Sequence, residues 1–114
     1  MSRRPYPSLR DRLLTLSFQL QYDGVPGPCW IWLGAIHKKG YGTLSMRVKG
    51  KRTPRSLFAH RVSFEEFRGV KLTRKQTVDH TCECPACINP DHHQVVTRKV
   101  NSELAWARRR ERSL

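Results

Sequence analysis

The apolar residues near the start of the chain recur at helical spacing. Leu9, Leu13 and Leu16 fall on one face of a helix, and Ser8 precedes them as a residue that often caps helix N-termini. The stretch 22–28 contains two Gly and two Pro, which break a helix. We therefore expect one short amphipathic helix at the start, ending before this stretch.

The apolar pattern then changes to short runs typical of strands. Residues 29–33 and 43–48 predict two short strands joined by a glycine-bearing turn, and 49–51 predicts a second turn. A helix is expected over 61–68, and Gly69 follows it as a C-cap. This middle segment therefore predicts a small antiparallel sheet with one helix.

The last third of the chain predicts a strand, a loop, a second strand and a helix. Residues 76–80 are strand-like, and 94–96 can return antiparallel to them after a cysteine-rich loop. Thr97 is a suitable N-cap for a final helix over 98–110. The loop is thus held between two strands that precede a helix.

At 114 residues the chain is long enough for one small domain with a thin hydrophobic core. We expect the large aromatic side chains, including Phe58 and Trp106, to lie in that core rather than on a binding surface. The predicted fold is α+β, a zinc-stapled domain with a short antiparallel basic sheet and a C-terminal ββα motif. Its expected segments are a basic leader and short helix (1–28), a basic sheet and helix (29–75), the ββα motif (76–110) and a tail (111–114).

The charge of the chain adds a partner to this picture. Lys and Arg number 22 against nine Asp and Glu, giving a formal net charge of +13. Such an excess favours a polyanionic partner, and nucleic acid fits better than a membrane surface because the basic residues are spread over several folded segments. No apolar stretch has the roughly 18 residues that a membrane span needs, and no signal-peptide core follows Arg3 and Arg4. We expect a cytoplasmic protein without a membrane partner.

Cysteines and histidines are concentrated in one loop. Cys82, Cys87 and His92 are each five residues apart, and the first predicted strand could bring Cys29 beside them. Thiolates and a neutral imidazole are the ligands that structural Zn²⁺ prefers, and a reducing compartment favours metal binding over disulfides. Two alternatives stay open: Cys84 could replace Cys29 in a wholly local site, and His93 could replace His92.

A second group of residues has ligands of another kind. Asp79 and His80 end a predicted strand, and Asn101 lies in the first turns of the final helix. The oxygen atoms of Asp79 and Asn101 suit Mg²⁺ or Mn²⁺, whereas the neutral imidazole of His80 can take a proton from water near pH 7. Hydrolysis of a phosphodiester requires such a cation and such a base. Alternatively, the pair at the strand end is a hydrogen-bonded surface turn.

At these positions the chain resembles the HNH nucleases, particularly the phage and homing-endonuclease type with a structural zinc site. The matching segments are VDH at 78–80, Cys82, Cys87, NPDH at 89–92, VT at 96–97 and Asn101, preceded by CWIWLG at 29–34, GYG at 40–42 and AHR at 59–61. The resemblance covers residues 29–103. Cys84 and His93 depart from the usual pattern of the family.

The resemblance implies a ββα-metal fold and a role for each matching residue. His80 would be the general base, and Asp79 and Asn101 would bind one catalytic cation. Asn89 would hold the loop through backbone hydrogen bonds and help to position the base. Cys29, Cys82, Cys87 and His92 would bind the structural zinc.

DNA contacts are expected on two surfaces. A two-stranded ribbon fits the major groove, and the predicted sheet and its turns carry many cations: Lys38, Lys39, Arg47, Lys49, Lys51, Arg52 and Arg55. Arg98 and Lys99 would contact phosphates beside the cut, and Arg61 is a further candidate. The arginines 108–110 and 112 are either a phosphate clamp or a solvated tail.

The sequence thus predicts an endonuclease that nicks or cuts double-stranded DNA, and the resemblance implies 3′-hydroxyl and 5′-phosphate ends. The alternative is a zinc-stabilised DNA-binding module without catalysis, with a regulatory or packaging role. Cutting both strands usually needs a homodimer, and no feature of the sequence indicates one. The sequence also does not reveal the target or the biological role, which ranges from intron homing to packaging, restriction or repair.

Overall fold

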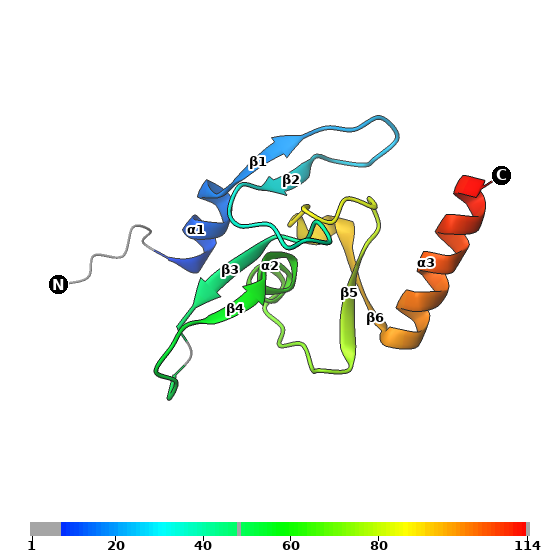
Figure 1. Cartoon of the computed structure of the whole chain (residues 1–114). Helices are drawn as coiled ribbons and strands as arrows, with labels where there is room; N and C mark the ends of the chain where they lie inside the picture. The colour runs from blue at the N-terminus through cyan, green and yellow to red at the C-terminus, as the bar shows by residue number, and fades with distance from the viewer. Residues whose placement is uncertain (1–7, 48, 114) are drawn as a thin grey trace.

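A computed structural model describes residues 8–47 and 49–113 of the chain (Figure 1). Its helices and strands follow one another in the order α1 (Leu9–Thr15), β1 (Ser17–Leu20), β2 (Cys29–Trp32), β3 (Thr43–Met46), β4 (Arg55–Phe58), α2 (Ala59–Arg68), β5 (Gln76–His80), a 3₁₀ turn (Pro90–His92), β6 (His93–Thr97) and α3 (Arg98–Ser113). In the described part of the chain the strands form antiparallel pairs, β1 with β2, β3 with β4, and β5 with β6. The expected α+β class with short antiparallel sheets is confirmed.

The strand pairing within the first half differs from the prediction. β2 and β3 were expected to form one hairpin, but β2 pairs with β1, and β3 pairs with β4. Between residues 33 and 42 the chain forms no regular strand, and an isolated antiparallel bridge pairs Ile36 with Gly42. The expectation was wrong because β1 and β4 directly adjoin helices, and their four-residue patterns were not separated from the helical signal.

The first helix follows its sequence signals. The Ser8 side chain accepts a hydrogen bond from the Asp11 amide and caps α1. Leu13 is fully buried, and Leu9 and Leu16 pack against the same core. The predicted amphipathic face is therefore the face that α1 turns toward the protein interior.

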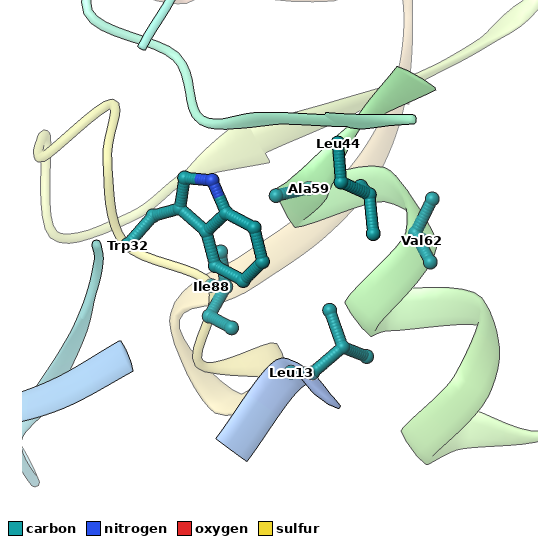
Figure 2. Packing of buried hydrophobic residues seen from close by; sticks show 6 residues of the cluster. All are labelled: Leu13, Trp32, Leu44, Ala59, Val62 and Ile88. Carbon is teal, nitrogen blue, oxygen red and sulfur yellow. The ribbon is translucent and has the colours of Figure 1, made fainter. Parts of the chain in front are cut away.

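The core is small and includes the buried indole of Trp32. Figure 2 shows this indole at one side of the cluster and Val62 of α2 at the other, with Leu13 of α1 between them and Ile88 of the cysteine-rich loop beneath the indole. A Cβ atom on Gly42 would lie 2.5 Å from Trp32 Cδ1, so only glycine lets the chain pass this ring. Phe58 and Trp106 were expected in the core, but they are 41% and 65% exposed. A domain of this size has too little interior for every aromatic ring.

We expect truncation of Leu13 to test this core directly. Leu13→Ala should lower the free energy of unfolding by about 2–5 kcal/mol, because a fully buried side chain leaves a cavity. Leu14→Ala is the matched control, since Leu14 is the next residue of α1 and is 46% exposed. It should change stability by no more than about 0.5 kcal/mol. Urea unfolding of both variants compares the two; equal losses would contradict the packing.

The C-terminal third forms the predicted ββα arrangement. β5 and β6 pair in a register that sets His80 opposite His93 and Asp79 opposite Gln94. The Thr97 hydroxyl accepts a hydrogen bond from the Val100 amide at the start of α3, as expected of a cap. α3 packs on both strands and continues to Ser113, so residues 111–113 are helical and not the expected tail. In Figure 1, α3 and the β3–β4 hairpin lie on opposite sides of the molecule.

The middle helix joins the core to the cysteine-rich loop. α2 begins at Ala59, two residues earlier than expected, and ends at Arg68; Gly69 follows as the predicted C-cap, with a left-handed φ of 66°. The buried Ser63 hydroxyl of α2 donates to the Ile88 carbonyl oxygen. Arg68 forms an ion pair with Asp91. These contacts fix the loop against α2.

Candidate metal centre and cleft

Three cysteines and one histidine form a compact group of ligand atoms. The Sγ atoms of Cys29, Cys82 and Cys87 and a ring nitrogen of His92 all lie within 4.8 Å of one another. His92 Nδ1 is 3.5 Å from Cys29 Sγ and 3.6 Å from Cys87 Sγ. Ligands of a tetrahedral zinc ion are separated by about 3.5 to 3.8 Å, given its usual bond lengths. The Cys₃His group therefore has the donor set and the spacing of a structural metal site.

Strand β2 brings the distant cysteine to the loop. One edge of β2 pairs with β1, and its other edge binds the loop backbone, where Trp32 N donates to Ala86 O and Ile88 N donates to Trp30 O. Cys29, at the first position of β2, thereby reaches the loop cysteines 53 and 58 residues further along the sequence. The predicted link between the first sheet and the loop is confirmed.

The surroundings of the group favour a bound cation. His92 Nε2 donates to the Pro26 carbonyl oxygen at 2.8 Å, which leaves Nδ1 to face the three sulfur atoms. Hydrogen bonds from neighbouring thiols, Cys87 first, lower the pKa of Cys82 to about 5, whereas burial raises the pKa of Cys29 to about 12. One thiol of the group thus loses its proton easily, whereas deprotonation of the others is unfavourable unless a bound cation compensates the negative charge.

The two alternative zinc ligands lie outside this group. Cys84 is half-buried and does not belong to the set of converging ligand atoms. His93 points to a different neighbourhood, where its Nε2 lies 2.9 Å from the Cys87 carbonyl oxygen and its ring contacts Phe64 and His80. The choice of Cys29 and His92 over these residues agrees with the structure.

The second predicted group lines a cleft of about 540 Å³. Asp79 and His80 reach it from the end of β5, and Asn101 reaches it from the first turns of α3. Five arginines line the same cleft: Arg61, Arg74, Arg98, Arg108 and Arg109. The structure therefore brings together the three residues with oxygen and imidazole donors, in surroundings that attract an anion.

The orientation of the His80 ring is set by the backbone of Cys87, a residue of the Cys₃His group. His80 Nε2 lies 3.1 Å from the Cys87 carbonyl oxygen, so Nε2 carries the proton and Nδ1 keeps a lone pair. Burial, the largest cause, lowers the pKa of His80, although Cys82, the Cys87 carbonyl and Asp79 act in the opposite direction. The imidazole is therefore neutral at pH 7. Cys87 links the two sites, since its sulfur belongs to the Cys₃His group and its carbonyl oxygen holds His80.

Asp79 is engaged on both carboxylate oxygens. Arg108 donates from Nη1 to Oδ1 at 2.9 Å and from Nη2 to Oδ2 at 3.0 Å, and Gln94 donates to Oδ2 at 2.7 Å. Burial raises the pKa of Asp79, but these hydrogen bonds outweigh it and the pKa lies below its usual value. A cation that binds Asp79 would therefore have to share this carboxylate with the Arg108 guanidinium or replace it.

Asn89 holds the loop but does not contact the base directly. Its amide donates to the Pro28 carbonyl oxygen at 2.8 Å, and its Oδ1 accepts from the Asp91 amide. The expected backbone hydrogen bonds are present. The positioning of His80, which was also expected of Asn89, is carried in this structure by the Cys87 carbonyl oxygen.

Several residues of the cleft were not identified from the sequence. The His60 ring lies 4.5 Å from the His80 ring, and Tyr41 stacks on His80 at 5.8 Å. Burial, as the main cause, lowers the pKa of His60 to about 2, and within the described residues its Nδ1 lacks a hydrogen-bond partner. The sequence signal for these two residues was their place in the matching segments, His60 in AHR and Tyr41 in GYG. Arg108 was predicted only as part of a phosphate clamp or a solvated tail, and no motif linked it to Asp79.

The cations expected to bind DNA lie on three parts of the molecule. Those of the β3–β4 hairpin and of the preceding turn are exposed: Lys38, Lys39, Arg47, Lys49, Lys51, Arg52 and Arg55. Arg98 and Lys99 are exposed at the start of α3. Arg61 differs, because its guanidinium donates to the carbonyl oxygens of Thr73 and Gln76 and so braces the turn before β5.

The chain is similar in sequence to a phage protein. Over 74 residues it is 38% identical to Protein 2.8 of Escherichia phage T7, a match that covers 65% of this chain and 46% of that protein. The chain therefore spans about half the length of this relative, whose name specifies no activity. No protein-family model matches the chain. No solved structure matches it either.

A last observation concerns membranes. Among the residues that the structure describes, no helix has the length and apolar character needed to span a bilayer.

Proposed function

We propose that this protein is an HNH-type endonuclease that hydrolyses phosphodiester bonds of double-stranded DNA. The observation that carries the proposal is the meeting of Asp79, His80 and Asn101 in one arginine-lined cleft. A DNA-binding module has no need for a neutral, oriented imidazole in the same cleft as two residues with hard oxygen ligands. Support also comes from the adjoining Cys₃His group, which stands in the sequence where the zinc-containing members of the family carry theirs.

The residues of the cleft have separate roles in the proposed reaction. His80 Nδ1 accepts a proton from water, the water oxygen forms a bond to phosphorus, and the bond from phosphorus to the 3′ oxygen breaks. The products are a 3′-hydroxyl and a 5′-phosphate, with the proton of the 3′-hydroxyl coming from solvent. Asp79 and Asn101 would hold one Mg²⁺ or Mn²⁺, which offsets the charge on the phosphate and the leaving oxygen when bound. Arg74 and Arg98, which line the cleft, would hold flanking phosphates.

A second candidate is a zinc-stabilised DNA-binding module. It is favoured by one observation, that both oxygens of Asp79 are satisfied within the protein by Arg108 and Gln94. Asp79 would then have a structural role that fastens α3 to β5. The same basic surface would bind DNA in either case, so binding alone does not separate the two candidates.

An end-labelled DNA duplex separates them. Purified protein should cleave the duplex when Mg²⁺ or Mn²⁺ is supplied, and a phosphatase and a ligase should identify 5′-phosphate and 3′-hydroxyl ends. EDTA added for only seconds should stop the reaction by binding the Mg²⁺ or Mn²⁺, before the structural metal leaves the protein. Binding of an intact duplex under every metal condition would favour the module instead.

The exposed hairpin cations lead to a prediction for DNA affinity. Arg52→Gln should weaken binding similarly for all sequences and reduce the slope of log affinity against log salt by about one, since one phosphate contact is removed. Arg10→Gln is the matched control, because Arg10 is also exposed but lies on α1 with its guanidinium 4.8 Å from the Phe67 ring centre. Titrations at several salt concentrations measure both slopes. Equal slopes for the two variants would exclude the hairpin as a contact surface.

A further inference from the structure

Arg108 has a different environment from that of its neighbour Arg110 on α3. Its side chain is 24% exposed, whereas Arg110 is exposed on another face of the helix. Its two terminal nitrogens bind both oxygens of Asp79, a carboxylate that is only 7% exposed. Its Nε also lies 3.8 Å from a carboxylate oxygen of Glu83. Arg108 is therefore held at the cleft by a planar, two-pronged ion pair.

This ion pair occupies the oxygen atoms that the proposed cation needs. Oδ2 accepts from both Arg108 and Gln94, and Oδ1 accepts from Arg108, so most of the roughly four lone-pair sites of this carboxylate are filled while Arg108 is in place. A divalent cation on the same carboxylate would also lie close to the positive guanidinium, so the two compete for Asp79. Because the carboxylate is buried, water cannot easily stabilise it while the two exchange.

The released guanidinium would remain inside the cleft. Arg108 lines the cleft together with His80 and Asn101, and its attachment to α3 keeps it there when it leaves Asp79. A guanidinium binds two phosphate oxygens with the same two-pronged geometry that it uses for a carboxylate. The chemistry that holds Arg108 on Asp79 thus also suits a DNA phosphate.

We infer that Arg108 is a phosphate-binding residue of the cleft, which stays on Asp79 until a divalent cation takes that carboxylate and frees it to bind DNA. The inference rests on the proposed function, because it requires Asp79 to bind a cation. It gives the cleft an order of events: cation binding comes first and raises the affinity for the phosphate. Without a cation, Arg108 contributes nothing to DNA binding and Asp79 stays neutralised.

Cation affinity is the first readout. Zinc-loaded protein without DNA is titrated with Mn²⁺, and bound metal is followed by electron paramagnetic resonance. Arg108→Ala should bind Mn²⁺ about tenfold more tightly than wild type, because a competing charged hydrogen bond has been removed. Arg108→Lys keeps the charge but loses the two-pronged geometry, so its Mn²⁺ affinity should lie between those of wild type and Arg108→Ala. Arg110→Ala removes the same charge from the same helix and should leave Mn²⁺ affinity within about twofold of wild type.

DNA affinity is the second readout. It is measured with and without Mn²⁺ in a His80→Ala background, which prevents cleavage. Arg108→Ala should weaken DNA binding about tenfold with Mn²⁺ and hardly at all without it. Arg110→Ala should have the same effect, large or small, under both conditions. Zinc content and thermal unfolding of each variant exclude loss of the fold as the cause.

The outcomes separate this inference from the proposed function. If Mn²⁺ binds wild type, is lost in Asp79→Asn, and binds Arg108→Ala no more tightly, the role of Arg108 is wrong while the cation site stands. An equal loss of DNA affinity with and without Mn²⁺ would also overturn it. If Asp79→Asn leaves Mn²⁺ binding unchanged, or wild type and Arg108→Ala bind none, the inference and the proposed cation site both fail.

Discussion

Replacement of Cys87 by serine is expected to remove the bound zinc and unfold the chain. The sulfur of Cys87 is one of the four converging ligand atoms and is fully buried. Structural zinc contributes about 10–16 kcal/mol to small zinc-binding peptides, whereas small domains are stable by only about 5–15 kcal/mol. Loss of the metal site would therefore cost a free energy comparable to the whole free energy of unfolding of the domain. Zinc content per chain and circular dichroism would follow both losses.

Cys84 provides the matched control for this prediction. It lies three residues from Cys87 in the same loop, is half-buried and is outside the group of converging atoms. Cys84→Ser should keep one zinc per chain and a thermal midpoint close to that of wild type. The assignment of the metal site would be contradicted if Cys84→Ser lost the metal or if Cys87→Ser kept it.

Replacement of His80 by alanine is expected to abolish cleavage while zinc and DNA binding persist. His80 carries the lone pair that accepts the proton of water in the proposed reaction, and removal of such a base usually slows catalysis by about 10²–10⁴-fold. Its side chain does not belong to the Cys₃His group, so zinc should remain. Single-turnover cleavage of a labelled duplex measures the rate, and metal analysis of the same sample measures zinc.

His37 is the control for the loss of an imidazole. It lies in the turn before β3, its ring contacts the Phe58 ring, and it does not line the cleft. His37→Ala should cleave at a rate within about threefold of wild type, as expected of a residue without a catalytic role. A His80→Ala protein that cleaves as fast as His37→Ala would end the proposed mechanism, even if both bind DNA.

The C-terminal half of the fold could be predicted because its signals are local. β5, its cysteine-rich loop and the cap at Thr97 each depend on residues close in sequence, and the ligand spacing of Cys82, Cys87 and His92 restricts the loop further. Only one long-range step was needed, the placement of Cys29, and the need for a fourth ligand supplied it.

The remaining differences come from interactions that sequence patterns do not encode. β1 and β4 are four residues long and directly adjoin α1 and α2, so their short strand patterns were not separated from the helical signal. The bond from His80 to the Cys87 carbonyl oxygen involves a backbone atom, which every residue type carries. The contact of Arg108 with Asp79 depends on the length and direction of α3. Neither contact has a residue signature.

Cleavage of supercoiled plasmid by zinc-loaded wild-type protein tests the central proposal most directly. As Mg²⁺ is titrated from zero, we expect conversion of supercoiled plasmid to open circles to rise and then saturate, with ligase able to reseal the nicks. A protein that retains its zinc and binds the plasmid, yet leaves it supercoiled at every concentration of Mg²⁺ and of Mn²⁺, would contradict the assignment of a nuclease site to the cleft of Asp79, His80 and Asn101.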